Sequence, residues 1–273
     1  MSSKRTWFSS RSLLYVVALL IALYILVPIY LITISAFSPR NAVFDYPKPF
    51  FPKAFSVETL SFFLNSFGVL ESVQMSIIVA ILTLVLSLLI GAPAGYTLAR
   101  YVFVGKDSYR LAILSTRAFP IVILAIPLAV TFIRWDLDDT AIGVALLHTA
   151  MALPTTILVT SSVFVSVSKE LEEAAMVLGC SRFGAFRRVA LPLALPGLAA
   201  SAIFTFVLSW NEVFAAAILT LQNPTLPARL VVQLNQSPLP FKFAGGFFIL
   251  VPAIVFMLFV RRYLFTLWGV KLK

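Results

Sequence analysis

Charged side chains are scarce in this sequence. Only 12% of its 273 residues are Asp, Glu, Lys or Arg, whereas 60% are hydrophobic, and the mean hydropathy is +1.00. So few charges cannot cover the surface of a soluble globule of this size. The composition excludes an ordinary soluble domain and indicates an integral membrane protein.

Cysteine and histidine are almost absent. The single Cys180 cannot form an internal disulfide, and the single His148 cannot build a multi-histidine metal site. We therefore expect no redox or zinc chemistry, no metal site and no bound cofactor. His148 lies next to Thr149 and is predicted to be a hydrogen-bonded packing residue.

A nucleotide-binding signature is also missing. The chain contains no GxxxxGK[ST] phosphate loop, so it cannot cradle ATP in that way. Energy for any work that the protein does must therefore come from a partner or from an ion gradient. The net charge of +10 does not indicate nucleic acid, because the Lys and Arg residues gather beside apolar runs and form no continuous basic face.

Long apolar runs dominate what is present. Six of them, each of about 20 residues or more, predict an all-α polytopic membrane protein with six transmembrane helices. The predicted spans are 12–37, 69–99, 111–133, 140–165, 193–221 and 243–260, and the third is predicted to be broken by Pro120 and Pro127. The first run exceeds the usual length of a signal-peptide core, about 7 to 15 residues, and is interpreted as an uncleaved span.

The segments between the runs set the predicted organisation. Residues 1–11 and 268–273 are predicted tails on either side of a transmembrane domain at 12–267. The Pro-rich and Phe-rich segment 38–66 is predicted to be an ordered external segment or an interfacial elbow. Gly91, Pro93 and Gly95 predict a kink or close packing of the second span.

The distribution of basic residues predicts the orientation. Of the 21 Lys and Arg residues, fourteen lie in segments on the same side as the N-terminus, six lie on the opposite side, and Arg117 lies within a span. By the positive-inside rule, both termini and segment 169–192 face the cytoplasm.

Segment 169–192, KELEEAAMVLGCSRFGAFRRVALP, is a polar island between two spans. Ser168 is a plausible N-cap, and Gly179 can close a first short helix in the left-handed conformation. The first helix would carry an apolar stripe of Leu171, Ala174, Ala175 and Leu178, and the second one of Phe183, Phe186 and Ala190. Such a hairpin suits a partner's groove, but an ordinary solvated loop helix fits the pattern equally well.

The island also carries a family resemblance. It resembles the EAA loop of binding-protein-dependent ABC importer permeases. The resemblance lies in Glu173-Ala174-Ala175, then Gly179 after three residues, then Val189-Ala190-Leu191-Pro192 after nine more. The chain from the first span to Val270-Lys271-Leu272-Lys273 resembles the MalG-type subunit of carbohydrate importers. It departs from the usual pattern at Leu178, where Asp is common, and at Cys180, where Ala is common.

The resemblance implies a transport subunit, and not an enzyme, in a bacterial or archaeal cell membrane. The transporter would use ATP to take up a sugar, a di- or oligosaccharide, that an extracytoplasmic binding protein delivers. The resemblance also implies a second homologous permease subunit, a dimer of ABC ATPase subunits that use ATP and Mg, and membrane lipid as partners. The loop would couple to the ATPase through Glu173, Ala174, Ala175, Gly179, Phe186 and Pro192. A permease for another delivered solute, such as glycerol phosphate, and a proton-coupled carrier are the alternatives.

Two further groups are candidates for function. Trp210-Asn211-Glu212 could face the translocation pathway, because an aromatic ring with amide and carboxylate neighbours suits a sugar; the triplet could equally pack a helix interface. Gln233, Asn235 and Gln236 lie in the Pro-containing segment 222–242, which could form a finger entering the binding protein. An ordinary connector is the competing interpretation of that segment.

Overall fold

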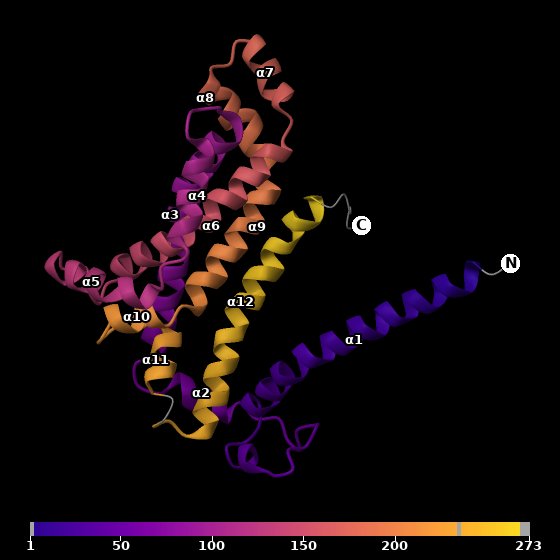
Figure 1. Cartoon of the computed structure of the whole chain (residues 1–273). Coiled ribbons are helices and arrows are strands. Elements are labelled where there is room, and N and C mark those ends of the chain that lie inside the picture. Colours follow the sequence, from indigo (N-terminus) through magenta and orange to yellow (C-terminus); the bar gives the residue numbers. More distant parts are fainter. Residues whose placement is uncertain (1–2, 234–235, 268–273) are drawn as a thin grey trace. The chain divides into compact units, whose positions relative to one another are not determined.

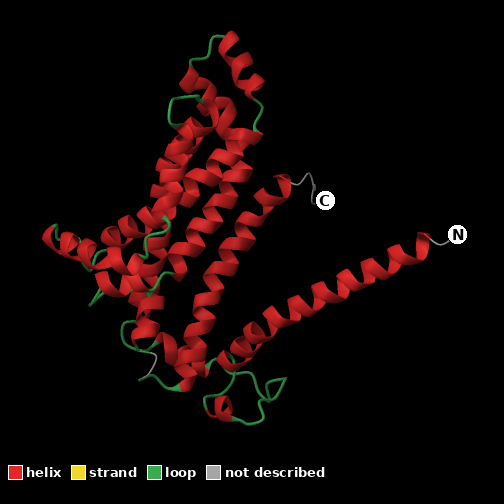
Figure 2. Cartoon of the chain, in the orientation of Figure 1, coloured by secondary structure: helices red, strands yellow, loops and turns green. Residues whose placement is uncertain are grey.

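The computed structural model describes the backbone of residues 3–233 and 236–267. This part of the chain is built from helices and loops, without strands (Figure 2). The chain divides into two compact units, Met1–Ser66 with Leu234–Phe248, and Phe67–Gln233 with Ile249–Lys273. The predicted tail 268–273 lies outside the described residues.

The first unit is organised around one long helix. Helix α1 (Ser3–Ala36) confirms the first predicted run as helical, and its side chains from residue 12 to residue 33 are mostly exposed, as expected of a lipid-facing helix. The 38–66 segment is ordered, as predicted, and contains the 3-10 helix η1 (Asn41–Phe44) and helix α2 (Glu58–Leu64). Phe63 of α2 is fully buried, with its ring centroid 4.8 Å from that of Phe241.

The second unit is a bundle of three long helices. Helices α3 (Val69–Arg100), α6 (Ala141–Ser166) and α9 (Leu191–Asn211) lie side by side (Figure 1). Helix α12 (Leu239–Leu267) passes from the first unit into this one. Trp210 Nε1, near the end of α9, donates to the Ile249 carbonyl of α12 at 2.8 Å.

Small residues bring α3 and α6 into direct contact. Gly91 and Gly95, one turn apart on α3, are buried, and the Thr160 hydroxyl of α6 donates to the Gly91 carbonyl at 2.9 Å. A Cβ at position 95 would lie 2.7 Å from the backbone nitrogen of Ser161. The close packing predicted from these glycines is confirmed, and α3 continues through Pro93.

Two predicted spans are not single helices. The run 111–133 is divided into α4 (Lys106–Thr116) and α5 (Ile121–Arg134), because Pro120 is extended and disfavours a helical residue before it. The run 193–221 stops at Asn211 and resumes as α10 (Phe214–Leu219). The predicted break at Pro120 is confirmed, whereas α5 continues through Pro127. The single-helix prediction was wrong for the run 193–221.

The six predicted spans are matched in part. Within the described residues, five helices are long and apolar enough to cross a membrane. They are Ser12–Ala36, Val69–Arg100, Ala141–Ser166, Arg182–Asn211 and Leu239–Val260.

Candidate functional site

The polar island forms a helical pair at one end of the bundle of α3, α6 and α9 (Figure 1). Helix α7 (Lys169–Val177) is followed by a turn and by the short helix α8 (Arg182–Ala185). A π-helical segment, η2 (Phe186–Ala190), then leads without interruption into α9. Helices α10 and α11 (Leu226–Val232) lie towards the opposite end of the bundle.

Gly179 closes α7 as the sequence predicts. Its φ of +90° is left-handed, its amide donates to the Met176 carbonyl, and the amide of Cys180 donates to the Ala175 carbonyl, each at 3.0 Å. This is the Schellman arrangement that ends a helix. A Cβ at position 179 would meet nothing within 4 Å, so glycine is required here by backbone conformation and not by space.

The predicted N-cap is only half right. Ser168 occupies the N-cap position of α7, but its hydroxyl donates to the Glu170 carboxylate and does not cap the helix. The cap that does form belongs to α8, where the Ser181 hydroxyl accepts from the Gly184 amide at 3.1 Å.

The apolar side chains of the helical pair point outward. Val177 is 88% exposed, Leu178 86% and Phe183 70%, and half of Leu171 is exposed as well. Arg182, Arg187 and Arg188 of the same segment are also exposed. Exposed apolar side chains with charged neighbours in the sequence are typical of a docking site for another protein.

The remaining predicted coupling residues differ in exposure. Glu173 is exposed and pairs with Lys169 one turn earlier at 3.1 Å. Ala174 is exposed and Ala175 is half-buried. Phe186 packs into the bundle, with its ring centroid 4.6 Å from that of Tyr96, and Pro192 is exposed in the first turn of α9.

The acidic residue that anchors α7 is one that the sequence did not single out. Glu172 is 4% exposed, and its carboxylate accepts from Arg100 Nε at 2.7 Å and from the Tyr96 hydroxyl at 2.5 Å. Arg100 Nη2 lies 2.6 Å from the same carboxylate and donates to the Val167 carbonyl at 2.8 Å. The pattern of one chain gives no signal for this contact, because Glu172 and Arg100 are 72 residues apart.

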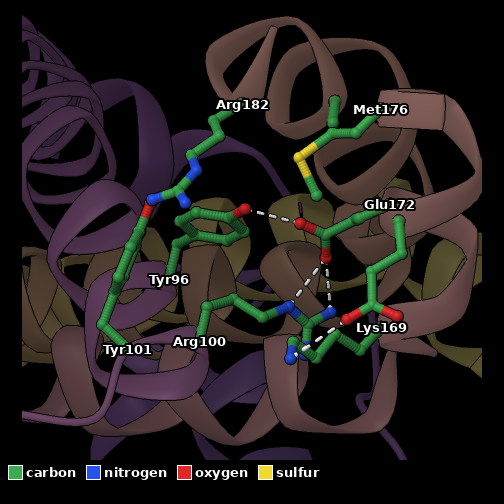
Figure 3. A pocket seen from close by; sticks show the side chains of 9 residues that line it. Tyr96, Arg100, Tyr101, Lys169, Glu172, Met176 and Arg182 are labelled. Carbon is green, nitrogen blue, oxygen red and sulfur yellow. Dashed lines mark hydrogen bonds and ion pairs between the residues drawn. The ribbon is translucent and has the colours of Figure 1, made fainter. Parts of the chain in front are cut away.

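A polar cavity lies beside this ion pair. It has a volume of about 300 Å³, and Lys169, Met176 and Arg182 line it together with the Tyr96, Arg100 and Glu172 group. In Figure 3 the side chains of Tyr96 and Arg100 both point to the Glu172 carboxylate. Charged groups and an aromatic ring therefore meet at the junction of α3 and α7.

The predicted pathway triplet lies where α9 ends. Trp210 is 1% exposed and stacks on Phe206, with ring centroids 5.9 Å apart. Asn211 is exposed, and its side-chain amide donates to the Val207 carbonyl. Only Asn211 of the three presents its side chain at the surface of this chain.

Glu212 belongs to a buried hydrogen-bond network. One carboxylate oxygen accepts from the Ala215 amide and the other from the Ala216 amide, each at 3.0 Å, so Glu212 stabilises the first turn of α10. Its Oε2 lies 3.2 Å from His148 Nε2, and His148 Nδ1 lies 2.9 Å from the Ser209 hydroxyl. His148 is buried and hydrogen-bonded, as the sequence predicts.

The predicted finger is partly helical. Within 222–242, α11 is buried against the start of α3, where the Leu226 amide donates to Ser76 Oγ at 2.7 Å. Gln233 is half-buried at the end of α11 and Gln236 is exposed, whereas Asn235 lies outside the described residues. Residues 226–232 of this segment pack on the bundle, and the finger itself stays a prediction.

No group of three or more His, Cys, Asp or Glu side chains that could hold a metal ion occurs among the residues that the structure describes. The interactions that the structure shows at the sites above are helix capping and ion pairing.

Several apolar helices long enough to cross a bilayer define a multi-pass membrane protein, and a glycine-closed helical pair is exposed at one end of its bundle. Residues 87–266 match the family described as binding-protein-dependent transport system inner membrane component, and the chain belongs to this family. It is an ABC transporter permease, a transport subunit of the inner membrane.

Relatives support the assignment over most of the chain. A probable ABC transporter permease of Bacillus subtilis, YurM, is 30% identical over 95% of this chain and 87% of its own length. The trehalose transport system permease SugB of Mycobacterium tuberculosis is 34% identical over 68% of this chain and 70% of its own. The diacetylchitobiose uptake permease DasC of Streptomyces coelicolor is 29% identical over 78% of each.

Solved structures show the same fold. A chain from a bacterial ABC transporter that imports the acidic polysaccharide alginate superposes with a TM-score of 0.74, at 21% identity, over 96% of this chain and 98% of that one. A chain of the methionine transporter MetNI in an inward-facing conformation superposes with a TM-score of 0.60, at 17% identity, over 72% of this chain and 95% of that one.

Proposed function

We propose that this permease takes part in ATP-driven import of a sugar, a di- or oligosaccharide, handed over by an extracytoplasmic binding protein. The observation that carries the proposal is the exposed helical pair α7 and α8, closed at Gly179, in a chain of this family. The chain has no phosphate loop, so ATP and Mg are used by a partner.

The helical pair would connect that partner to the spans. Two ATPase subunits would approach each other on ATP, each gripping the helical pair of one permease subunit, and a second homologous permease subunit would complete the pathway. Val177, Leu178 and Phe183 would supply apolar contact, with Glu173 and the two alanines at the rim. The contacts between the helical pair and the ATPase must differ between the two conformational states of the transporter. A surface that binds both states equally cannot shift the equilibrium between them.

We also propose a membrane topology. Both termini and the helical pair would face the cytoplasm, with six crossings in all. Helix α5 alone would extend about 21 Å, less than the roughly 30 Å of a bilayer core. We infer that α4 and α5 together make the third crossing, with the break at Pro120 inside it.

The sugar substrate is inferred from relatives named for diacetylchitobiose, trehalose and arabinooligosaccharides. Asn211 would contact the sugar, because it is the exposed member of the triplet, while buried Trp210 and Glu212 would hold the end of α9 in place. The substrate class is tested by competition during uptake of labelled trehalose or diacetylchitobiose. A competing disaccharide should lower uptake, and competition by glycerol phosphate alone would contradict the sugar assignment.

Cross-linking tests the ATPase contact. With Cys180 replaced by serine, Leu178→Cys places one thiol on the exposed helical pair, and Val104→Cys serves as a control on another fully exposed turn. We expect a short bifunctional reagent to join Leu178→Cys to the co-purified ATPase subunit and to leave Val104→Cys unjoined. Equal cross-linking of both variants would contradict a specific contact.

A deletion tests the external segment. We propose that the segment from Gln233 to Gln236 contacts the binding protein, since α11 holds its start on the bundle. Removing Asn235 to Leu239 should abolish stimulation of ATP hydrolysis by the binding protein while basal hydrolysis persists. Wild-type uptake and stimulation in the deleted protein would show that the segment is an ordinary connector.

A further inference from the structure

We propose that Glu172, Arg100 and Tyr96 form a joint that transmits movement of α7 to the transmembrane helix α3. In this role Glu172 is a positioning residue for coupling, and the exposed Glu173 is not the residue that connects α7 to the bundle. The proposal rests on the proposed function for its consequence in transport, whereas the joint itself is a property of the fold.

The geometry of the joint fixes the Glu172 carboxylate from two directions. Arg100, the last residue of α3, approaches one oxygen with two nitrogens at 2.6 and 2.7 Å, and Tyr96, one turn earlier on the same helix, donates to the other oxygen. Two contacts from residues four apart on one helix prevent α7 from pivoting about a single bond. The side chains of Arg100 and Glu172 are 10% and 5% exposed, so water competes little for these bonds.

The other charged side chains of α7 pair locally. Lys169 pairs with Glu173 in the same helix, and Glu170 accepts from Ser168 in the adjoining turn. The links at the two ends of α7 are an extended residue, Val167, and the left-handed Gly179. A helix held at its ends by such turns needs a side-chain contact to move as one body with a span.

The joint extends to two further elements through aromatic rings. The ring centroid of Tyr96 lies 5.3 Å from that of Phe164 at the end of α6 and 4.6 Å from that of Phe186 in η2. Arg100 adds a hydrogen bond to the Val167 carbonyl, just beyond α6. Movement of α7 would therefore be transmitted to α3 through the ion pair and to α6 through the packing of aromatic rings.

Two independent readouts test the joint. The first is the distance between spin labels at Thr97→Cys on α3 and Val177→Cys on α7, both exposed positions, with Cys180 replaced by serine. The second is the amount of solute imported per ATP hydrolysed by the complete transporter in proteoliposomes. Glu172→Gln removes the buried charge, and Glu170→Gln is the matched control on the exposed side of the same helix.

We expect Glu172→Gln to broaden the distance distribution and to lower import per ATP by about tenfold or more, because it leaves Arg100 buried without its partner. Tyr96→Phe should cause a smaller change in the same direction. If Glu172→Gln fails to insert into the membrane, Tyr96→Phe still tests the joint. The pair Glu172→Gln with Arg100→Gln should be no worse than the worse single variant, because both members of one interaction are gone. Glu170→Gln should match the wild type in both readouts.

Unchanged narrow distances in Glu172→Gln and Tyr96→Phe would overturn the joint, whatever the chain transports. Absence of import by the wild-type complex would overturn the proposed function alone, because the distance measurement would still decide whether α7 is tied to α3. Additive losses in the double variant would show that Glu172 and Arg100 act separately and would also overturn the proposal.

Discussion

Gly95→Ala is expected to destabilise the folded protein by about 3 kcal/mol, at the upper end of what overpacking usually costs. The added methyl group would overlap the Thr160 hydroxyl and would lie 2.7 Å from the backbone nitrogen of Ser161. The backbone of α6 cannot rotate away as a side chain could, so α3 and α6 must separate. Thermal unfolding of the purified protein in detergent measures the loss, together with the yield of inserted protein.

Gly246→Ala is the matched control, because this glycine also lies within a long helix. Its added methyl group would meet only Ile32 Cγ2, at 3.4 Å, an ordinary contact. Alanine is the better helix former by up to about 1 kcal/mol, so this variant should be unchanged or slightly more stable. Equal unfolding temperatures for the two variants would contradict the close approach of α3 and α6.

Gly179→Val is expected to lower uptake by about tenfold or more while ATP hydrolysis continues. Valine is strained at a φ of +90°, at a cost of about 1 to 3 kcal/mol, which is enough to shift the turn between α7 and α8. The open space around position 179 means that strain, not collision, causes the effect. The measurement is uptake and ATP hydrolysis by the same preparation.

Gly105→Val provides a control of equal backbone cost. Gly105 has a φ of +84°, and a Cβ there also meets nothing within 4 Å, but it lies in the turn before α4 and outside the helical pair. We expect this variant to lose similar stability and to keep its import per ATP. If both variants lost coupling alike, Gly179 would have no special role in the connection to the ATPase.

Local signals explain which parts of the fold the sequence predicts. Gly179 sits just after an apolar stripe, where only a left-handed turn can follow, and its φ and hydrogen bonds confirm that prediction. Gly91 and Gly95 recur one turn apart in an apolar run, which is the pattern of a close helix contact. The pathway and coupling roles of the candidate residues stay predictions.

Hydropathy shows how apolar a segment is, but it does not show whether the segment forms one continuous helix. The run 193–221 is mostly apolar, yet α9 ends at Asn211, and the Glu212 carboxylate accepts the amides of the second and third residues of a new helix, α10. The division of the third run at Pro120 was predicted, because a proline is a signal that the sequence itself shows. The Glu172 contact was missed because a buried ion pair between distant residues leaves no periodic pattern in one sequence.

Uptake into proteoliposomes tests directly whether this permease takes part in ATP-driven import of a sugar. The purified chain, with its companion permease, ATPase subunits and binding protein, is reconstituted and supplied with labelled disaccharide. We predict uptake that requires both ATP and the binding protein and that persists when a protonophore collapses the ion gradient. Uptake without ATP that the protonophore abolishes would contradict the account and would identify a proton-coupled carrier.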